Sequence, residues 1–296
     1  MSKLVVMTDG VAGIPRELAE KYRIKVVPTA SIIYDGHTYL EGSTINAMQA
    51  YQLLREDPDK FTTAAMSPAY LLDVYRELKT EYQEILFITI SSALSAFYKS
   101  ACLAAELFSK ESPETNVRIV DSRTAGSGQG LLVMAAARAS AAGMNLEQAA
   151  GFAEQARQKT GTLILLDTIR YIYRAGRAPK LVSRVGSMLG VKPLSRMNGS
   201  GELNPAGVSR TRKGGIRRML DIVKEETGSD ALHFMVMHAD APGVAEELSE
   251  QIEEEFNCLS MIISEFSPVM GYATGPGTLT IGYHPELDLP RQQNVT

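Results

Sequence analysis

Apolar positions in the first half of the chain alternate between short continuous runs and sets with helical spacing. The continuous runs, which have the length of buried strands, cover residues 4–7, 85–90 and 117–122. Helical spacing follows each of them, over residues 14–22, 94–105 and 130–142. Parallel strands need long crossover connections, and those connections are usually helices. The pattern therefore predicts an N-terminal α/β domain built on a doubly wound, mostly parallel sheet with helices on both faces.

The stretch between the first two of these units is less regular. Residues 24–28 and 31–34 are predicted to be strands, and the second of them ends in a turn at residues 35–36. Thr44 is expected to cap the next helix. Residues 61–70, with the sequence FTTAAMSPAY, are predicted to form a hydroxyl-rich loop that leads into a helix.

The alternation of strands and helices restarts near Asn145. The expected helices cover residues 146–159, 182–189, 210–227 and 242–256, with a short helix that ends at Gly176. The expected strands cover residues 162–167, 231–238 and 259–266, with a strand pair turned at 198–201 and a final strand after a glycine-rich loop. A chain of 296 residues exceeds the size at which one core usually stops growing. We therefore predict two α/β domains, 1–158 and a smaller one at 159–285, followed by a tail at 286–296.

Composition and charge narrow the class of protein. Hydrophobic residues make up 45% of the chain and charged residues 22%, and the formal net charge is −4. These values are typical of a globular protein and favour neither nucleic acid nor a membrane surface as a partner. The spacing of metal ligands is found neither between the two cysteines, Cys102 and Cys258, nor among the four histidines. The first apolar run is too short for a signal peptide or a membrane span, so we expect a cytoplasmic protein. We also expect a monomer that holds no metal.

Hydroxyl groups gather where the second predicted strand ends. Ser91, Ser92 and Ser95 stand between that strand and a helix, whose first amides and dipole favour an anion. Ser92 could equally serve only as the cap of the helix. Asp9 and Asp121 follow the neighbouring strands, and ligands collect at the carboxyl ends of parallel strands. A phosphotransferase or hydrolase that uses Asp9 or Asp121 is therefore one hypothesis.

Basic residues crowd the start of a predicted helix. Five cations, Arg210, Arg212, Lys213, Arg217 and Arg218, occur within nine residues, an arrangement that opposes the helix dipole. Either they form a solvated face, or they meet a carboxylate, a phosphate or an acidic partner. No catalytic motif accompanies them, because the GSGQG segment lacks dinucleotide-loop spacing and no serine lies in a GxSxG elbow.

Seven segments occur in one order along the chain. They are TDG, TTAAMSP, SSALSAFYKSA, DSRTAGSGQG, IRYIYRAGR, VKPLSRMNGSGEL with SRTRKGG after it, and GPGTLTIGY. Together they resemble the signature segments of the DegV family over nearly the whole chain. The resemblance implies two α/β domains that enclose one long-chain fatty acid in the cleft between them, with no other cofactor. It also implies a protein without catalytic machinery of its own, which presents the acyl group to a separate ATP-dependent subunit of fatty acid kinase for acyl-phosphate formation in phospholipid synthesis.

The resemblance also implies which residues hold the carboxylate. The family's carboxylate-binding threonine falls on Thr63 and its serine on Ser95, with Ser91, Ser92 and backbone amides in support. The family arginine near the carboxyl group and the kinase contact falls on Arg210.

The closing loop of the family, His-x-Gly-Pro-Gly, matches residues 273–277. Thr274 and Gly275 are therefore assigned to the site, and Ala273 replaces the histidine. Three further departures are Ala64-Ala65 for Ser-Gln, Ala96-Phe97 for Gly-Thr, and Gly214-Gly215 for Lys-Ala. Each buried methylene of a fatty acid contributes about 0.8 kcal/mol, so we expect lipid binding to survive changes at the head group. A carrier of another anionic amphiphile, with a pocket reshaped by the altered loops, is the remaining hypothesis.

Overall fold

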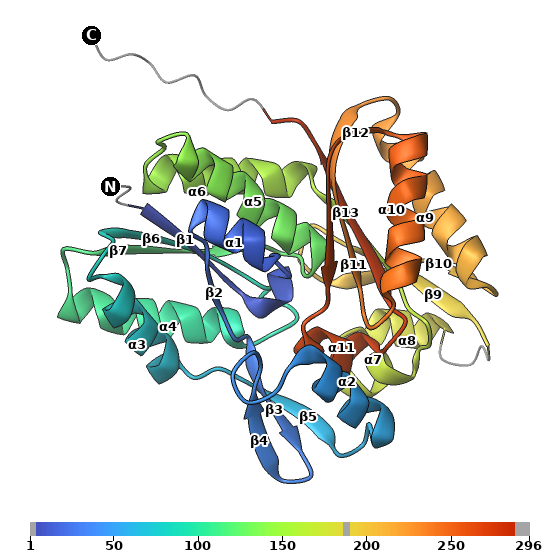
Figure 1. The fold of residues 1–296 in the computed structure, drawn as a ribbon, viewed down its shortest axis with the longest axis horizontal. Helices are drawn as coiled ribbons and strands as arrows, with labels where there is room; N and C mark the ends of the chain where they lie inside the picture. The colour runs from blue at the N-terminus through green and yellow to red at the C-terminus, as the bar shows by residue number, and fades with distance from the viewer. Residues whose placement is uncertain (1–3, 186–189, 288–296) are drawn as a thin grey trace.

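The computed structural model describes residues 4–185 and 190–287, and a parallel sheet forms the centre of its first half. The sheet order is β2-β1-β6-β7, with strands β2 (Lys25–Val27), β1 (Leu4–Asp9), β6 (Glu84–Thr89) and β7 (Asn116–Asp121). Helices α3 (Pro68–Leu78) and α4 (Phe97–Glu111) cover one face, and α1 (Arg16–Tyr22), α5 (Ser127–Ala141) and α6 (Leu146–Lys159) cover the other (Figure 1). A short 3-10 helix, η1 (Gly10–Ala12), follows β1. The predicted doubly wound parallel sheet is confirmed.

A small antiparallel sheet of order β4-β3-β5 projects from this unit (Figure 1). It contains β3 (Ala30–Tyr34), β4 (His37–Leu40) and β5 (Phe61–Ala65). The prediction of a loop over residues 61–70 was wrong for its first half, because β5 pairs with β3 and places Thr63 opposite Ile32. Phe61 is the only fully buried residue of β5, so the strand depends on pairing that its hydrophobic pattern does not reveal.

Helix α2 (Ala47–Glu56) begins with a different cap from the one predicted. The Asn46 side chain accepts a hydrogen bond from the Gln49 backbone N–H, and the Gln49 side chain accepts one from the Asn46 N–H, which is a capping box. The Thr44 hydroxyl instead accepts a hydrogen bond of 2.7 Å from the Leu40 backbone N–H. Thr44 therefore stabilises the turn after β4 and does not cap the helix.

A six-stranded sheet forms the second half of the chain. Its order is β10-β9-β8-β13-β11-β12, with strands β8 (Gly161–Leu165), β9 (Lys192–Met197), β10 (Leu203–Ser209), β11 (Ala231–His238), β12 (Asn257–Glu265) and β13 (Leu279–Pro285). The β11 and β12 strands are parallel and joined by α10 (Pro242–Glu255), as predicted, whereas the other neighbours are antiparallel. Helix α9 (Arg212–Thr227) packs beside α10 on the outer face of the sheet (Figure 1).

Three short helices lie at one end of this sheet: α7 (Arg170–Ala175), α8 (Pro179–Val185) and α11 (Pro268–Thr274). Helix α11 replaces the beginning of the predicted glycine-rich loop, because Pro268 occupies the first helical position and Gly275 ends the helix. The predicted helix over residues 182–189 is confirmed as far as Val185, and residues 186–189 lie outside the described part, as do residues 288–296 of the predicted tail. Within the described ranges, no helix is long and apolar enough to cross a membrane.

Helix α5 lies between the parallel sheet and the six-stranded sheet. It contacts β1 and β6 on one side and β8, β11 and β13 on the other. Twelve of its residues are buried, and most of them are alanine, glycine or leucine. Small side chains allow the backbones of β13 and α5 to approach closely, and a Cβ added at Gly282 would lie 2.7 Å from the Ser127 carbonyl carbon. One hydrophobic core therefore includes the parallel sheet, α5 and the inner face of the six-stranded sheet, and a separate core lies under α9 and α10 on the outer face of that sheet.

We expect Gly282→Ala to destabilise the fold by about 1–3 kcal/mol, because the added methyl group meets backbone that cannot move aside. The control is Gly151→Ala in α6, where a Cβ meets nothing within 4 Å and alanine is the better helix former by roughly 1 kcal/mol. Urea unfolding of both variants checks the prediction. Unchanged stability of Gly282→Ala would show that the two elements are not packed as described.

Candidate functional site

A cavity of about 240 Å³ lies between the small sheet, the carboxyl ends of β1 and β6, and α11. Its walls are mainly apolar and include Val11, Ile90, Leu94, Ile164, Ile172, Leu203 and Met270. These side chains come from both halves of the chain, so the cavity lies between the two α/β domains. Such walls favour an apolar ligand, because contact with them removes apolar surface from water.

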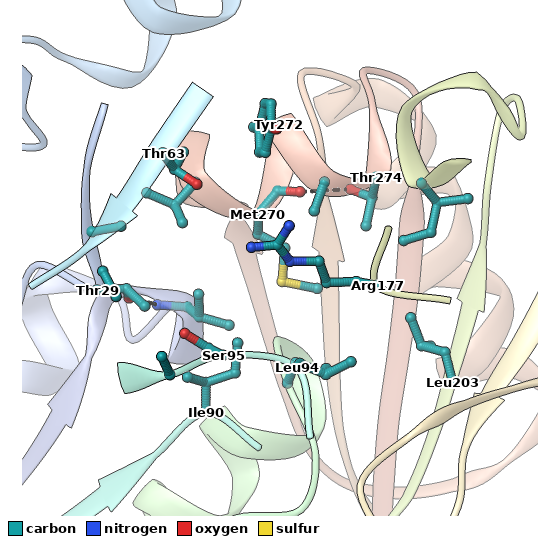
Figure 2. Close-up of a pocket in the computed structure, with 18 of the residues that line it drawn as sticks. Thr29, Thr63, Ile90, Leu94, Ser95, Arg177, Leu203, Met270, Tyr272 and Thr274 are labelled. Carbon is teal, nitrogen blue, oxygen red and sulfur yellow. Dashed lines mark hydrogen bonds between the residues drawn. The ribbon is translucent and has the colours of Figure 1, made fainter. Parts of the chain in front are cut away.

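Three polar side chains with unused donors line the cavity: Thr63, Ser95 and Arg177. Thr63 lies on β5, Ser95 in the loop after β6, and Arg177 just after α7. Figure 2 shows the Arg177 guanidinium extending into the cavity, with the hydroxyl groups of Thr63 and Ser95 on the facing side. Together they offer one cation and two hydroxyl donors, which suits the recognition of a single anionic group.

The loop that carries Ser95 is held in place by Ser91. The backbone N–H of Ser95 donates to the Ser91 carbonyl oxygen at 3.2 Å, and the Ser91 hydroxyl donates to the Gly201 carbonyl oxygen at 2.8 Å. The Ser95 hydroxyl accepts a hydrogen bond of 3.2 Å from the Phe97 N–H, so its own proton stays available to a ligand. Ser91 is fully buried outside the cavity lining and therefore acts on the site through the loop.

The segment that ends α11 contributes a second wall. Thr274 lines the cavity, but its hydroxyl donates to the Met270 carbonyl oxygen at 2.9 Å (Figure 2). Gly275 lies outside the lining, at a φ of +89° that favours glycine, and a Cβ there would lie 2.2 Å from the Tyr171 ring. Ala273 lines the cavity, so the position where the resemblance expects a histidine does face the ligand space.

Arg177 was not among the residues predicted for the site. Its guanidinium donates to the Ala175 carbonyl oxygen and forms no ion pair within the described residues. The sequence did contain a signal, because Arg177 follows the helix-ending Gly176 inside the IRYIYRAGR segment. Its approach to Thr63 and Ser95, however, depends on how two distant parts of the chain pack.

The predicted Arg210 lies on the surface outside the cavity lining. Three other members of its basic cluster are ion-paired: Arg212 with Asp167, Arg217 with Asp221 and Glu255, and Arg218 with Glu225. These pairs favour a solvated face for most of the cluster. Arg210 and Lys213 form no ion pair among the residues that the structure describes.

Asp9 is sealed inside the core below the cavity. Its Oδ1 accepts hydrogen bonds from the Val11 N–H at 3.1 Å and the Thr29 hydroxyl at 2.8 Å, and its Oδ2 from the Ile90 N–H at 2.7 Å and the Gln129 amide at 3.0 Å. Burial raises the pKa of Asp9, and these four donors oppose that rise. A carboxylate with no exposed surface and both oxygens occupied cannot attack a substrate. Asp9 therefore organises the strand ends, and its carboxylate offers no free oxygen to a ligand in the cavity.

Asp121 and Ser92 form a separate contact at the surface. The Ser92 hydroxyl donates to Asp121 Oδ2 at 2.6 Å, and the backbone N–H groups of Ser92 and Arg123 donate to Oδ1. Helix α4 begins later, at Phe97, so Ser92 does not cap it. Neither Ser92 nor Asp121 lines the cavity. Among the described residues, no group of three or more His, Cys, Asp or Glu side chains is placed to hold a metal ion.

The fold and cavity define a two-domain α/β protein with an apolar cavity that carries a cation and hydroxyl groups. The family model described as "Uncharacterised protein, DegV family" matches residues 3–286. A DegV domain-containing protein of Caldanaerobacter subterraneus subsp. tengcongensis is 31% identical over 278 residues, which cover 93% of this chain and 96% of that protein. The chain therefore belongs to the DegV family.

Solved structures of DegV proteins have the same fold. A DegV family protein from Thermus thermophilus, described by its fatty acid binding, matches with a TM-score of 0.86 and 25% identity over 96% of this chain and 100% of that one. A DegV lipid-binding protein from Thermotoga maritima matches with a TM-score of 0.86 and 25% identity over 96% of this chain and 98% of that one. The two-domain α/β architecture is thus shared with proteins that are described as lipid binders.

Proposed function

We propose that this protein binds a long-chain fatty acid in the cavity between its two domains. The observation that carries the proposal is the convergence of Arg177, Thr63 and Ser95 on one cavity with otherwise mainly apolar walls. A fatty acid has the matching chemistry, with one carboxylate and a long apolar tail. The description of the Thermus thermophilus relative as a fatty acid binder supports the same ligand class.

The apolar tail and the carboxylate head group of a fatty acid would contribute to the binding free energy for different physical reasons. Each methylene removed from water contributes about 0.8 kcal/mol, so the tail supplies most of the affinity. A buried carboxylate loses its hydration and needs donors in return, and a hydrogen bond to a charged group contributes about 1.5–3 kcal/mol. Arg177 provides the opposite charge, and Thr63 and Ser95 provide neutral donors. We expect the head group to fix the orientation of the ligand as well as to add affinity.

Native mass spectrometry of the protein purified from a bacterial host tests the proposal, followed by organic extraction and lipid analysis. The expected result is one bound molecule with the mass of a long-chain fatty acid. A different anionic amphiphile in the extract would favour the alternative carrier function. A protein that is purified empty and takes up no added fatty acid would contradict both.

We further propose that the protein presents its fatty acid to a separate ATP-dependent kinase and does no chemistry of its own. Arg177 is exposed as well as facing the cavity, which supports a head group close to the surface. Adding a bacterial fatty acid kinase subunit and ATP to the loaded protein should yield acyl-phosphate. Ala273→His restores the histidine of the family at a position that faces the cavity, and we expect it to raise the yield.

A further inference from the structure

A second cavity, of about 290 Å³, lies beyond the end of β7. It is bounded by the loop after β7, by the segment between α6 and β8, and by the turn between β9 and β10. Arg123 and Arg157 both line it, together with Gln158 and Asn198. We call this space the basic cavity.

The basic cavity contains two positive charges and no acidic side chain in its lining. Neither Arg123 nor Arg157 forms an ion pair within the described ranges, although many other arginines of the chain do. The nearby Asp121 carboxylate is occupied by Ser92 and by the Arg123 backbone N–H. Glu202, close to Asn198, is paired with Lys180 at 2.7 Å. The donors to Asp121 are neutral, so its charge remains, but its carboxylate lies outside the cavity lining and forms no ion pair with either guanidinium among the described residues.

The two arginines differ in how firmly they are held. Arg157 is partly buried, and its Nη1 donates to the Asp121 carbonyl oxygen at 2.8 Å, which fixes the guanidinium at the cavity wall. Its other N–H groups have no partner among the described residues. Arg123 is exposed and makes no side-chain hydrogen bond there. The Thr160 hydroxyl is already engaged by the Ala156 carbonyl oxygen, so the free donors come mainly from the arginines.

The position of the basic cavity in the fold also suits a ligand. It lies at the carboxyl end of a parallel strand, where α/β proteins generally bind their ligands. The loop after β7 separates it from the first cavity, because Thr124 lines the basic cavity and Ala125 lines the other one. The basic cavity is therefore a distinct space that the fatty acid proposal leaves unused.

We propose that the basic cavity binds a phosphate group, either as the free ion or as the monoester of a small molecule. Two unpaired guanidinium groups match the charge of a phosphate dianion better than that of a single carboxylate, and the planar guanidinium fork matches the geometry of phosphate oxygens. This site is independent of fatty acid binding.

Isothermal titration of the full chain at constant ionic strength tests the site, with inorganic phosphate, glycerol 3-phosphate, and acetate as separate probes. We expect saturable binding of the phosphate probes and none of acetate. Tighter binding of glycerol 3-phosphate would identify a phosphate monoester as the ligand, and equal binding would identify the free ion. Arg123→Gln with Arg157→Gln should weaken phosphate binding about tenfold or more.

The matched control removes two charges elsewhere, by Arg23→Gln with Lys213→Gln, whose side chains are exposed and outside both cavities. An unchanged far-UV circular dichroism spectrum and an unchanged midpoint of urea unfolding show that each variant is folded. Arg123→Gln alone gives a second test, because this side chain supports no described hydrogen bond. Absence of saturable phosphate binding, or equal binding by the double variant and its control, would overturn the proposal.

Discussion

Arg177→Gln is expected to weaken fatty acid binding about ten- to hundredfold. The substitution removes the only cation that lines the cavity among the described residues, and a hydrogen bond to a charged group contributes about 1.5–3 kcal/mol. Adding Thr63→Ala and Ser95→Ala should weaken binding further, because the carboxylate then loses its remaining side-chain donors. Displacement of a fluorescent fatty acid measures the affinities.

Arg210→Gln is the control for this series, since Arg210 is an exposed arginine outside the cavity lining. We expect its affinity for fatty acid to equal that of the unsubstituted protein. Wild-type affinity in the triple variant would contradict the assigned carboxylate site. A loss of affinity in Arg210→Gln alone would place the carboxylate near the basic cluster instead.

Glu41→Gln is expected to stabilise the fold at alkaline pH. Glu41 follows β4, and its Oε2 is buried without a hydrogen-bond partner, as is the hydroxyl of Ser267 at the start of α11. Burial raises the pKa of Glu41 to about 7; the nearby Ser267 hydroxyl opposes the rise, and the charge of Asp9 adds to it. Burial raises the pKa of Tyr51 in α2, and the charge of Glu41 adds to that rise. The carboxyl group is therefore best accommodated in its neutral form.

The direction of the pH effect follows from this raised pKa. Between the ordinary value of 4.5 and about 7 the folded protein keeps a proton that the unfolded chain releases, so stability falls as pH rises through this window. The full loss above pH 7 is about 3 kcal/mol. Glu41→Gln should remove that loss, so its advantage in urea unfolding should be large at pH 8 and small at pH 4.5.

Glu81→Gln, which replaces an exposed carboxyl group, provides the matched control for the loss of one negative charge. Its difference from the unsubstituted protein should stay small at both pH values. A Glu41→Gln variant that is equally stable or less stable at pH 8 would mean that Glu41 has a partner for its charge.

The parts of the fold that could be predicted from the sequence are those with a local cause. Buried runs such as β6 and the periodic helix α6 have their own hydrophobic pattern, and α6 was predicted at its observed bounds. Strand β5 and the insertion of β13 between β8 and β11 depend on pairing with distant partners, which no local pattern reveals. The predicted domain boundary at residues 158–159 stays a prediction.

The residues of the candidate site also differ in whether they could be predicted from the sequence. Thr63 and Ser95 could be placed in one site through their family segments, and both line the same cavity. Arg177 is brought to them by the packing of α7 against α11, which is a tertiary effect. Ser91 and Asp9 have polar side chains that suggested chemistry, but their hydrogen bonds are all internal, and they hold the strand ends in place.

The position of α5 limits how the two domains can move. Because this helix is buried against both sheets, separating the domains would expose apolar surface along its whole length. The two sheets should therefore unfold together and behave as one rigid body while the protein is folded. A constant angle between the domains fixes the width of the cavity, so we expect the length of the proposed acyl ligand to be set by lining side chains such as Leu203.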